Sequence, residues 1–128
     1  MPKIRVLLAD DHQAMLARVR RELGEEFEIV GAVRDGQAAV EAVLLFDPDV
    51  IVTDISMPGM DGLQVASVLK ANQCRARVVF LSIHEDPDFF DAAFAAGASG
   101  YVTKARLSTD LIRAIRQVLQ GHKFVSPP

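Results

Sequence analysis

The feature that most constrains the fold is a fivefold alternation between short apolar runs of strand length and segments whose apolar residues recur at helical spacing. Parallel strands need crossover connections, so this alternation predicts a mainly parallel sheet with helices on both faces. The expected strands are Ile4–Leu8, Phe27–Val33, Val50–Thr53, Val78–Leu81 and Gly100–Val102. We therefore predict an α/β fold built on a five-stranded parallel sheet.

The arrangement expected for such a chain is a flavodoxin-like, doubly wound sheet with strand order 2-1-3-4-5. Local signals mark the helix starts: Asp35 and Gly36 precede the second helix, and Asp61 and Ser108 are expected to cap the third and fifth. The 128 residues fit one domain. We expect that domain to span residues 1–122, with residues 123–128 as the start of an interdomain linker because they end in Ser-Pro-Pro.

Charge and cysteine content exclude several function classes. Fourteen Lys and Arg against seventeen Asp and Glu give a net charge of −3, which lacks the basic footprint of a domain that binds nucleic acid directly. A single cysteine, Cys74, excludes an internal disulfide and fits a reducing compartment. No apolar run approaches the roughly 18 residues needed to cross a bilayer. We expect a soluble, cytoplasmic protein without membrane or direct nucleic-acid contacts.

Acidic residues are concentrated where expected strands end. Asp10 and Asp11 follow the first strand, and Asp54 follows the third. In the predicted strand order these two strands are neighbours, so the three carboxylates would share one site at the carboxyl edge of the sheet. Two like charges about 4 Å apart repel by roughly 4 kcal/mol at an effective dielectric constant near 20, so such a cluster requires a cation or raised pKa values. Hard oxygen ligands favour Mg²⁺.

A hydroxyl and an ammonium group complete this predicted site. Ser82 follows the fourth expected strand and Lys104 follows the fifth, which brings both to the same edge. A nucleophilic carboxylate, a metal ion and a second cation are the groups that phosphoryl transfer uses. The residues therefore indicate phosphoryl transfer to Asp54. We assign His12, beside the acidic pair, no catalytic role, because a histidine at a helix start is usually a solvated or capping residue.

Three stretches of the sequence carry a more specific signal. With their spacing, Val6–His12, Val52–Gly62 and Gly97–Lys104 closely resemble the motifs of the receiver domain of bacterial two-component response regulators. The resemblance covers essentially the whole chain. The last stretch, with Gly121–Pro127 after it, looks most like the NarL/FixJ-like subfamily. Receivers of that subfamily are joined to a C-terminal helix-turn-helix DNA-binding domain, which this chain lacks.

The resemblance implies a phosphorylation-dependent signalling switch in transcription regulation rather than a conventional enzyme. Asp54 would accept a phosphoryl group from a sensor histidine kinase, and the domain would catalyse only its own phosphorylation and autodephosphorylation. Ser82 and Lys104 would contact the phosphoryl group, and Tyr101 would turn inward once the loop carrying Ser82 has moved. The implied Mg²⁺ ligands are Asp10, Asp11, Asp54 and the backbone carbonyl of Ser56. Expected partners are the kinase, the effector domain and a second copy in a homodimer.

Two positions depart from the pattern of that family. Ala105 follows Lys104 where the family often has a proline in a cis linkage. A cis bond before alanine would cost about 2.5–4 kcal/mol, so we expect the Lys104–Ala105 bond to be trans. Ile83 follows Ser82 where the family usually has a small residue, so we expect restricted access of water and small phosphodonors to the site.

Other function classes share parts of this pattern. A haloacid-dehalogenase-type phosphatase would carry Asp-x-Asp after the first strand, whereas Asp10 and Asp11 are adjacent. A flavodoxin-like electron carrier needs a hydroxyl- and glycine-rich phosphate loop where this chain has carboxylates that would repel a flavin phosphate. The main alternative is a receiver-like interaction module that works without phosphorylation, which a measured absence of Asp54 phosphorylation would favour.

Overall fold

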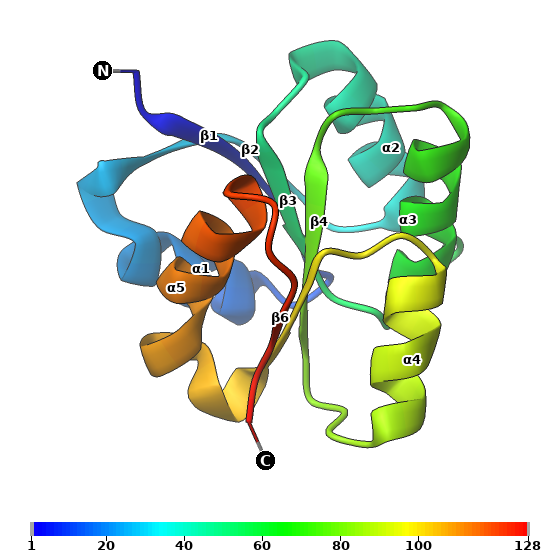
Figure 1. Cartoon of the computed structure of the whole chain (residues 1–128). Coiled ribbons are helices and arrows are strands. Elements are labelled where there is room, and N and C mark those ends of the chain that lie inside the picture. The colour runs from blue at the N-terminus through cyan, green and yellow to red at the C-terminus, as the bar shows by residue number, and fades with distance from the viewer. Residues whose placement is uncertain (1, 128) are drawn as a thin grey trace.

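The computed structural model describes residues 2–127, which form one parallel sheet of six strands in the order β2-β1-β3-β4-β5-β6 (Figure 1). The strands are β1 (Ile4–Ala9), β2 (Phe27–Val33), β3 (Val50–Thr53), β4 (Arg77–Ser82), β5 (Gly100–Thr103) and β6 (Phe124–Val125). The α-helices are α1 (Gln13–Leu23), α2 (Gly36–Phe46), α3 (Gly62–Ala71), α4 (Pro87–Ala95) and α5 (Leu107–Leu119). The predicted α/β class and the order of the first five strands are confirmed, and the predicted strand ends agree to within one residue.

The prediction of five strands is wrong by one, because β6 adds to the edge of β5. The amide of Phe124 donates to the carbonyl of Ser99 at 3.1 Å, and the amide of Ser126 donates to the carbonyl of Tyr101 at 2.9 Å. The Phe124 ring is buried in the same apolar layer as α5. Two residues are too short to show strand periodicity in a sequence, so this strand depends on the hydrogen-bonding edge that β5 presents.

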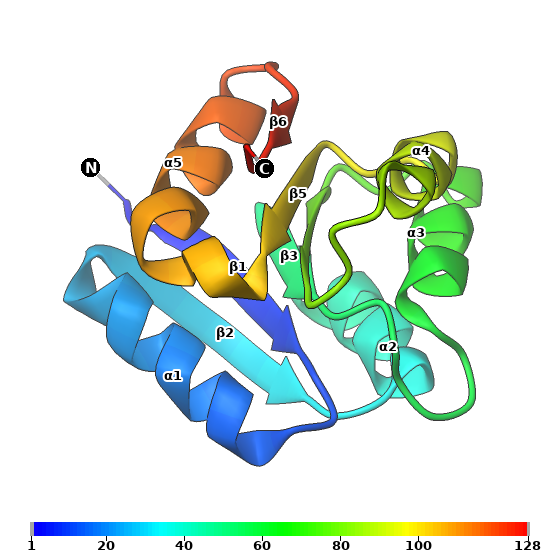
Figure 2. The ribbon, with the colours of Figure 1, turned by 90° about the horizontal axis from the view of Figure 1, so that it is seen from below.

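Helices cover both faces of the sheet, as Figure 2 shows: α1 and α5 lie on one face, and α2, α3 and α4 lie on the other. Alternating side chains of each central strand enter the two apolar layers. In β1, Val6 and Leu8 belong to the layer under α1 and α5, while Leu7 and Ala9 belong to the opposite layer. Burial on both faces explains why β1, β3 and β4 are almost entirely apolar. Within residues 2–127, no helix is both long enough and apolar enough to cross a membrane.

Of the two predicted helix caps, the one at Asp61 is present, and Asp35 caps α2 as well. The Asp35 carboxylate accepts from the amide of Ala38 at 2.8 Å, and Asp61 forms a reciprocal capping box with Gln64. The predicted cap at Ser108 is wrong, because a 3₁₀ turn over Lys104–Arg106 runs directly into α5 and places Ser108 inside its first turn. The chain therefore enters α5 without the extended residue that a side-chain cap needs.

A buried polar network joins the end of the chain to β5 and α5. Asp110 is fully buried, and its Oδ2 accepts from Ser126 Oγ at 2.7 Å and from Arg106 Nε at 2.8 Å. The amide of Thr103 donates to Ser126 Oγ at 3.2 Å. Burial alone would raise the pKa of Asp110, but these hydrogen bonds and the Arg106 charge outweigh it and hold the pKa below its ordinary value.

Removing the hydroxyl of Ser126 should destabilise the fold. In Ser126→Ala the buried amide of Thr103 loses its acceptor and Asp110 loses a donor, so we expect the free energy of unfolding to fall by about 1–3 kcal/mol. Urea unfolding measures this change, with Ser108→Ala, at an exposed position of α5, as the matched control. Equal stabilities for the two variants would contradict the structural role given to Ser126.

The lowered pKa of Asp110 should make part of the stability acid-sensitive. Its folded pKa lies below the unfolded value of about 3.9, so ionised Asp110 stabilises the fold above that pH, and the contribution is lost as the pH falls through the folded pKa. We expect the free energy of unfolding of the wild type to fall more steeply below about pH 4 than that of Asp110→Asn. Urea unfolding at a series of pH values tests this. Asp91→Asn, on the exposed side of α4, should keep the wild-type slope, and parallel slopes for wild type and Asp110→Asn would refute the expectation.

Candidate functional site

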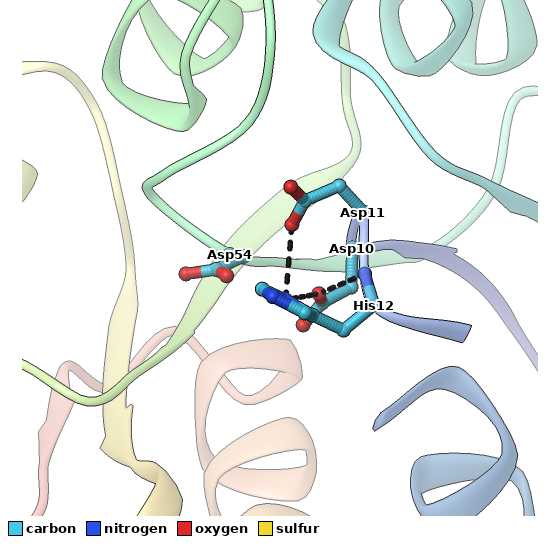
Figure 3. A group of neighbouring side chains, drawn as sticks. All are labelled: Asp10, Asp11, His12 and Asp54. Atoms are coloured by element: carbon cyan, nitrogen blue, oxygen red, sulfur yellow. Dashed lines mark hydrogen bonds and ion pairs between the residues drawn. The ribbon is translucent and has the colours of Figure 1, made fainter. Parts of the chain in front are cut away.

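Three carboxylates and an imidazole meet at the carboxyl edge of the sheet. Figure 3 shows Asp10, Asp11 and His12 at the end of β1 and Asp54 at the end of β3. One ligand atom from each of these four residues lies within 4.8 Å of the other three. Asp10 and Asp54 are buried, at 4% and 5% exposure, and Asp11 is half-buried. The pairing of β1 with β3 produces this cluster, because it places the residues after Ala9 and Thr53 side by side.

The main chain fixes the position of Asp54. Its amide donates to the carbonyl of Ala9 at 2.9 Å, which continues the β1–β3 ladder by one residue. One carboxylate oxygen, Oδ1, accepts from the amide of Ile55 at 2.7 Å. The loop then returns so closely that the amide of Gly62 donates to the carbonyl of Ile55 at 2.7 Å, and a Cβ at Gly62 would lie 2.2 Å from the carbonyl oxygen of Asp54. Only glycine fits where α3 starts against the residue that carries the carboxylate.

Lys104 provides the positive charge of the site. Its Nζ lies 3.1 Å from Asp54 Oδ2 and 3.2 Å from Asp10 Oδ2, with the side chain only 12% exposed. One ammonium group faces three carboxylates, which leaves the cluster with an excess of negative charge. No cis peptide bond occurs in residues 2–127, so the expected trans linkage between Lys104 and Ala105 is confirmed.

Ser82 and Tyr101 meet at the backbone of His84. Ser82 is fully buried, and its Oγ accepts from the amide of His84 at 3.1 Å. Tyr101 is also fully buried, and its hydroxyl donates to the carbonyl of His84 at 2.8 Å. Burial raises the pKa of Tyr101, a hydrogen bond with Ser82 lowers it in part, and the nearby Asp54 charge adds to the increase. The Tyr101 ring points inward in this structure, because it is fully buried and lies edge-on to Phe90 with ring centroids 4.6 Å apart.

The carboxylate cluster fits a hard divalent cation. Asp11 Oδ1 is buried and has no hydrogen-bond partner, although His12 Nδ1 lies 3.1 Å from it, because that contact lacks hydrogen-bond geometry. A buried carboxylate oxygen without a partner is costly unless a cation or water satisfies it. Together with Asp10 and Asp54 it offers the oxygen donors that Mg²⁺ uses. Ser56, two residues beyond Asp54, lies on the exposed loop at the rim of this cluster.

Sequence reasoning missed two features of the site. His12 is solvent-exposed at the start of α1, as expected, but its ring also belongs to the four-residue cluster. His84 stacks flat on Phe89, with ring centroids 4.0 Å apart, at the wall of an open groove of about 700 Å³ that extends from Asp11 past Pro58. Spacing along the chain does not reveal either feature, because both depend on how the strand-end loops lie against one another.

Comparison with known proteins relates this geometry to a family. Residues 6–116 match the family model described as the response regulator receiver domain. The transcriptional regulatory protein DegU of Brevibacillus brevis is 38% identical over 127 residues, which cover 98% of this chain and 54% of DegU. The solved signal receiver domain of the response regulator NarL from Mycobacterium tuberculosis has a TM-score of 0.90 and 34% identity, covering 95% of this chain and 100% of that one.

A third relative is seen in a complex with DNA. The structure of two RcsB dimers bound to two parallel DNAs matches with a TM-score of 0.87 and 28% identity, covering 97% of this chain and 65% of the RcsB chain. This chain therefore spans about half the length of DegU and somewhat less than two thirds of that RcsB chain.

Removing one carboxylate tests the cation site. Asp11→Asn keeps the shape of the side chain but removes its charge, so we expect the affinity for Mg²⁺ to fall by at least about tenfold. Calorimetric titration with Mg²⁺ measures the change, and Asp91→Asn, on the exposed side of α4, should bind Mg²⁺ as the wild type does. An unchanged affinity in Asp11→Asn would exclude Asp11 from the cation site.

Proposed function

The chain belongs to the response regulator receiver domain family, and on this premise we propose that Asp54 accepts a phosphoryl group from a phosphohistidine of a sensor histidine kinase. Receiver domains of NarL- and DegU-type regulators are signalling modules that act as phosphorylation-dependent switches in the control of transcription. One observation carries the proposal: Asp54 is a buried carboxylate paired with Lys104 and set beside two further carboxylates at the end of β3.

The proposed reaction transfers the phosphoryl group between two side chains. A carboxylate oxygen of Asp54 forms a bond to phosphorus while the bond between phosphorus and the imidazole nitrogen breaks. That nitrogen keeps the electron pair, and the imidazole leaves as a neutral ring when its other nitrogen carries a proton. Asp54 Oδ1 is held by the amide of Ile55 and Oδ2 by Lys104, so the carboxylate is oriented before a donor arrives.

The pocket must then hold a larger negative charge. Phosphorylation replaces one carboxylate charge by a group that carries about −1.5 to −2 charges, beside the charges of Asp10 and Asp11. Lys104 is close enough to follow that charge with a small movement of its flexible side chain. Asp10, Asp11, Asp54 and the backbone carbonyl of Ser56 would hold a Mg²⁺ ion, which supplies positive charge to the phosphoryl oxygens.

The switch in this proposal centres on Ser82. Its hydroxyl would turn toward a phosphoryl oxygen and release the amide of His84, which begins the segment leading to α4. Tyr101 already points inward through its bond to the carbonyl of the same residue, so phosphorylation would stabilise this position rather than create it. The surface formed by α4, β5 and α5 would change as a result. Water would later hydrolyse the acyl phosphate, which is the only other reaction proposed for the domain.

We also propose that this chain acts within a longer, cytoplasmic DNA-binding regulator. DegU and NarL are named as transcriptional regulators, and RcsB is described as dimers on DNA. A C-terminal helix-turn-helix domain would follow the receiver, with residues 123–128 as the start of the connection even though Phe124–Val125 joins the sheet. With a charge of −3, the receiver itself would contribute kinase contacts and self-association rather than DNA contacts.

Asp54→Asn tests the phosphoacceptor. Incubation with acetyl phosphate and Mg²⁺, followed by intact-mass measurement, should add one phosphoryl group to the wild type and none to Asp54→Asn, because an amide is a poor nucleophile. Asp91→Asn should be phosphorylated as the wild type is. If Asp54→Asn gains the group at the wild-type rate, the nucleophile is another residue. If the wild type gains none, even from a phosphorylated kinase, the domain is an interaction module that works without phosphorylation.

A further inference from the structure

We propose that His12 supplies a nitrogen ligand to the divalent cation held by the acidic cluster, and thereby sets which metals the site prefers. The inference rests on the proposed function in one respect only, namely that the cluster of Asp10, Asp11 and Asp54 holds a cation. It adds a side-chain ligand that the receiver resemblance does not include, and it concerns the selectivity of the site rather than the identity of the phosphoacceptor.

The distances around His12 match those between ligands of one metal ion. Its Nδ1 lies 3.2 Å from Asp10 Oδ1 and 3.1 Å from Asp11 Oδ1. In an octahedral site with metal–ligand distances of about 2.1 Å, adjacent ligands are about 3.0 Å apart and opposite ligands about 4.2 Å apart. The four ligand atoms, including one from Asp54, lie within 4.8 Å of one another, so small side-chain movements suffice to enclose one ion.

The backbone brings the imidazole to this position. The amide of His12 donates to Asp10 Oδ1 at 2.9 Å, which closes a tight turn between the two residues. His12 is the N-cap residue of α1, yet its side chain makes no cap hydrogen bond and instead lies over the carboxylates (Figure 3). The side chain is 70% exposed, so packing does not hold the ring in place. Its placement is explained by its polar neighbours in the cluster.

A hydrogen bond accounts for only one of the two contacts of His12 Nδ1. A proton on Nδ1 serves Asp10, but the contact with Asp11 lacks hydrogen-bond geometry and leaves the buried Oδ1 of Asp11 without a partner. A metal ion between these atoms uses the lone pair of a neutral imidazole and one from each carboxylate. It therefore satisfies all of them at once.

An imidazole among carboxylates changes the preference of the site. Oxygen ligands alone suit Mg²⁺, whereas an imidazole favours first-row transition metals, whose affinities for nitrogen ligands rise along the series from Mn²⁺ toward Cu²⁺. His12 therefore acts as a specificity-determining residue that raises the affinity for a metal such as Co²⁺ relative to Mg²⁺.

Metal titrations of the whole chain test this selectivity. We expect the ratio of Co²⁺ affinity to Mg²⁺ affinity, measured by calorimetry, to fall at least about tenfold in His12→Ala. His122→Ala is the matched control, because His122 is an exposed histidine that belongs neither to the groove nor to the four clustered residues. It should keep the wild-type ratio. The same ratio in wild type and His12→Ala would overturn the inference.

A spectroscopic measurement separates ligation from a purely structural effect. With Mn²⁺ bound, pulsed electron paramagnetic resonance should detect a directly coordinated ¹⁴N nucleus in the wild type and in His122→Ala, and none in His12→Ala. Bound Mn²⁺ without nitrogen coupling in the wild type would overturn the role of His12 and leave the phosphorylation of Asp54 untouched. Conversely, wild type that binds Mn²⁺ with nitrogen coupling but is never phosphorylated would overturn the proposed function alone.

Discussion

The pairing of Lys104 with Asp54 and Asp10 is the interaction on which this edge of the molecule depends. Two carboxylates about 4 Å apart repel by roughly 4 kcal/mol at an effective dielectric constant near 20, and here two buried carboxylates lie beside a third. The Nζ of Lys104 reaches both buried groups, at 3.1 and 3.2 Å. Lys104 follows β5 directly, and in a parallel sheet the end of β5 lies at the same edge as the ends of β1 and β3. The strand order therefore places the ammonium group of Lys104 beside the carboxylates.

β5 consequently links three parts of the molecule. Lys104, directly after β5, forms an ion pair with Asp54. Tyr101, the second residue of β5, donates a hydrogen bond to the carbonyl of His84. The amide of Thr103 bonds to Ser126, and β6 lies along the other edge of the same strand. A small displacement of β5 would change the lengths of these hydrogen bonds. It would therefore alter the contacts at the acidic pocket, at the start of α4 and at the end of the chain.

The parts of this structure that follow from short-range pattern were predictable from the sequence, and the parts that depend on distant contacts were not. Apolar runs place the first five strands, and the strand-end rule for doubly wound sheets brings Asp10, Asp11 and Asp54 together. β6 needs the edge of β5, and the Ser126 network needs a buried carboxylate sixteen residues away. His12 carries no periodic signal either, since only the folded turn shows that its ring lies over the carboxylates.

The two oxygens of Asp54 have different environments, and in the proposed function this difference would let one residue serve both as the nucleophile and as the start of the switch. Oδ1 accepts a hydrogen bond from the backbone amide of Ile55. A change in the charge on Oδ1 would therefore change the strength of this bond to the loop that leads into α3. Oδ2 faces Lys104, a side chain that can move with the added charge while the backbone stays in place. Gly62 closes against the carbonyl of the same residue and leaves that loop little space to absorb a shift. In the proposed function, phosphorylation of Asp54 would therefore shift the strand-end loops as well as the modified side chain.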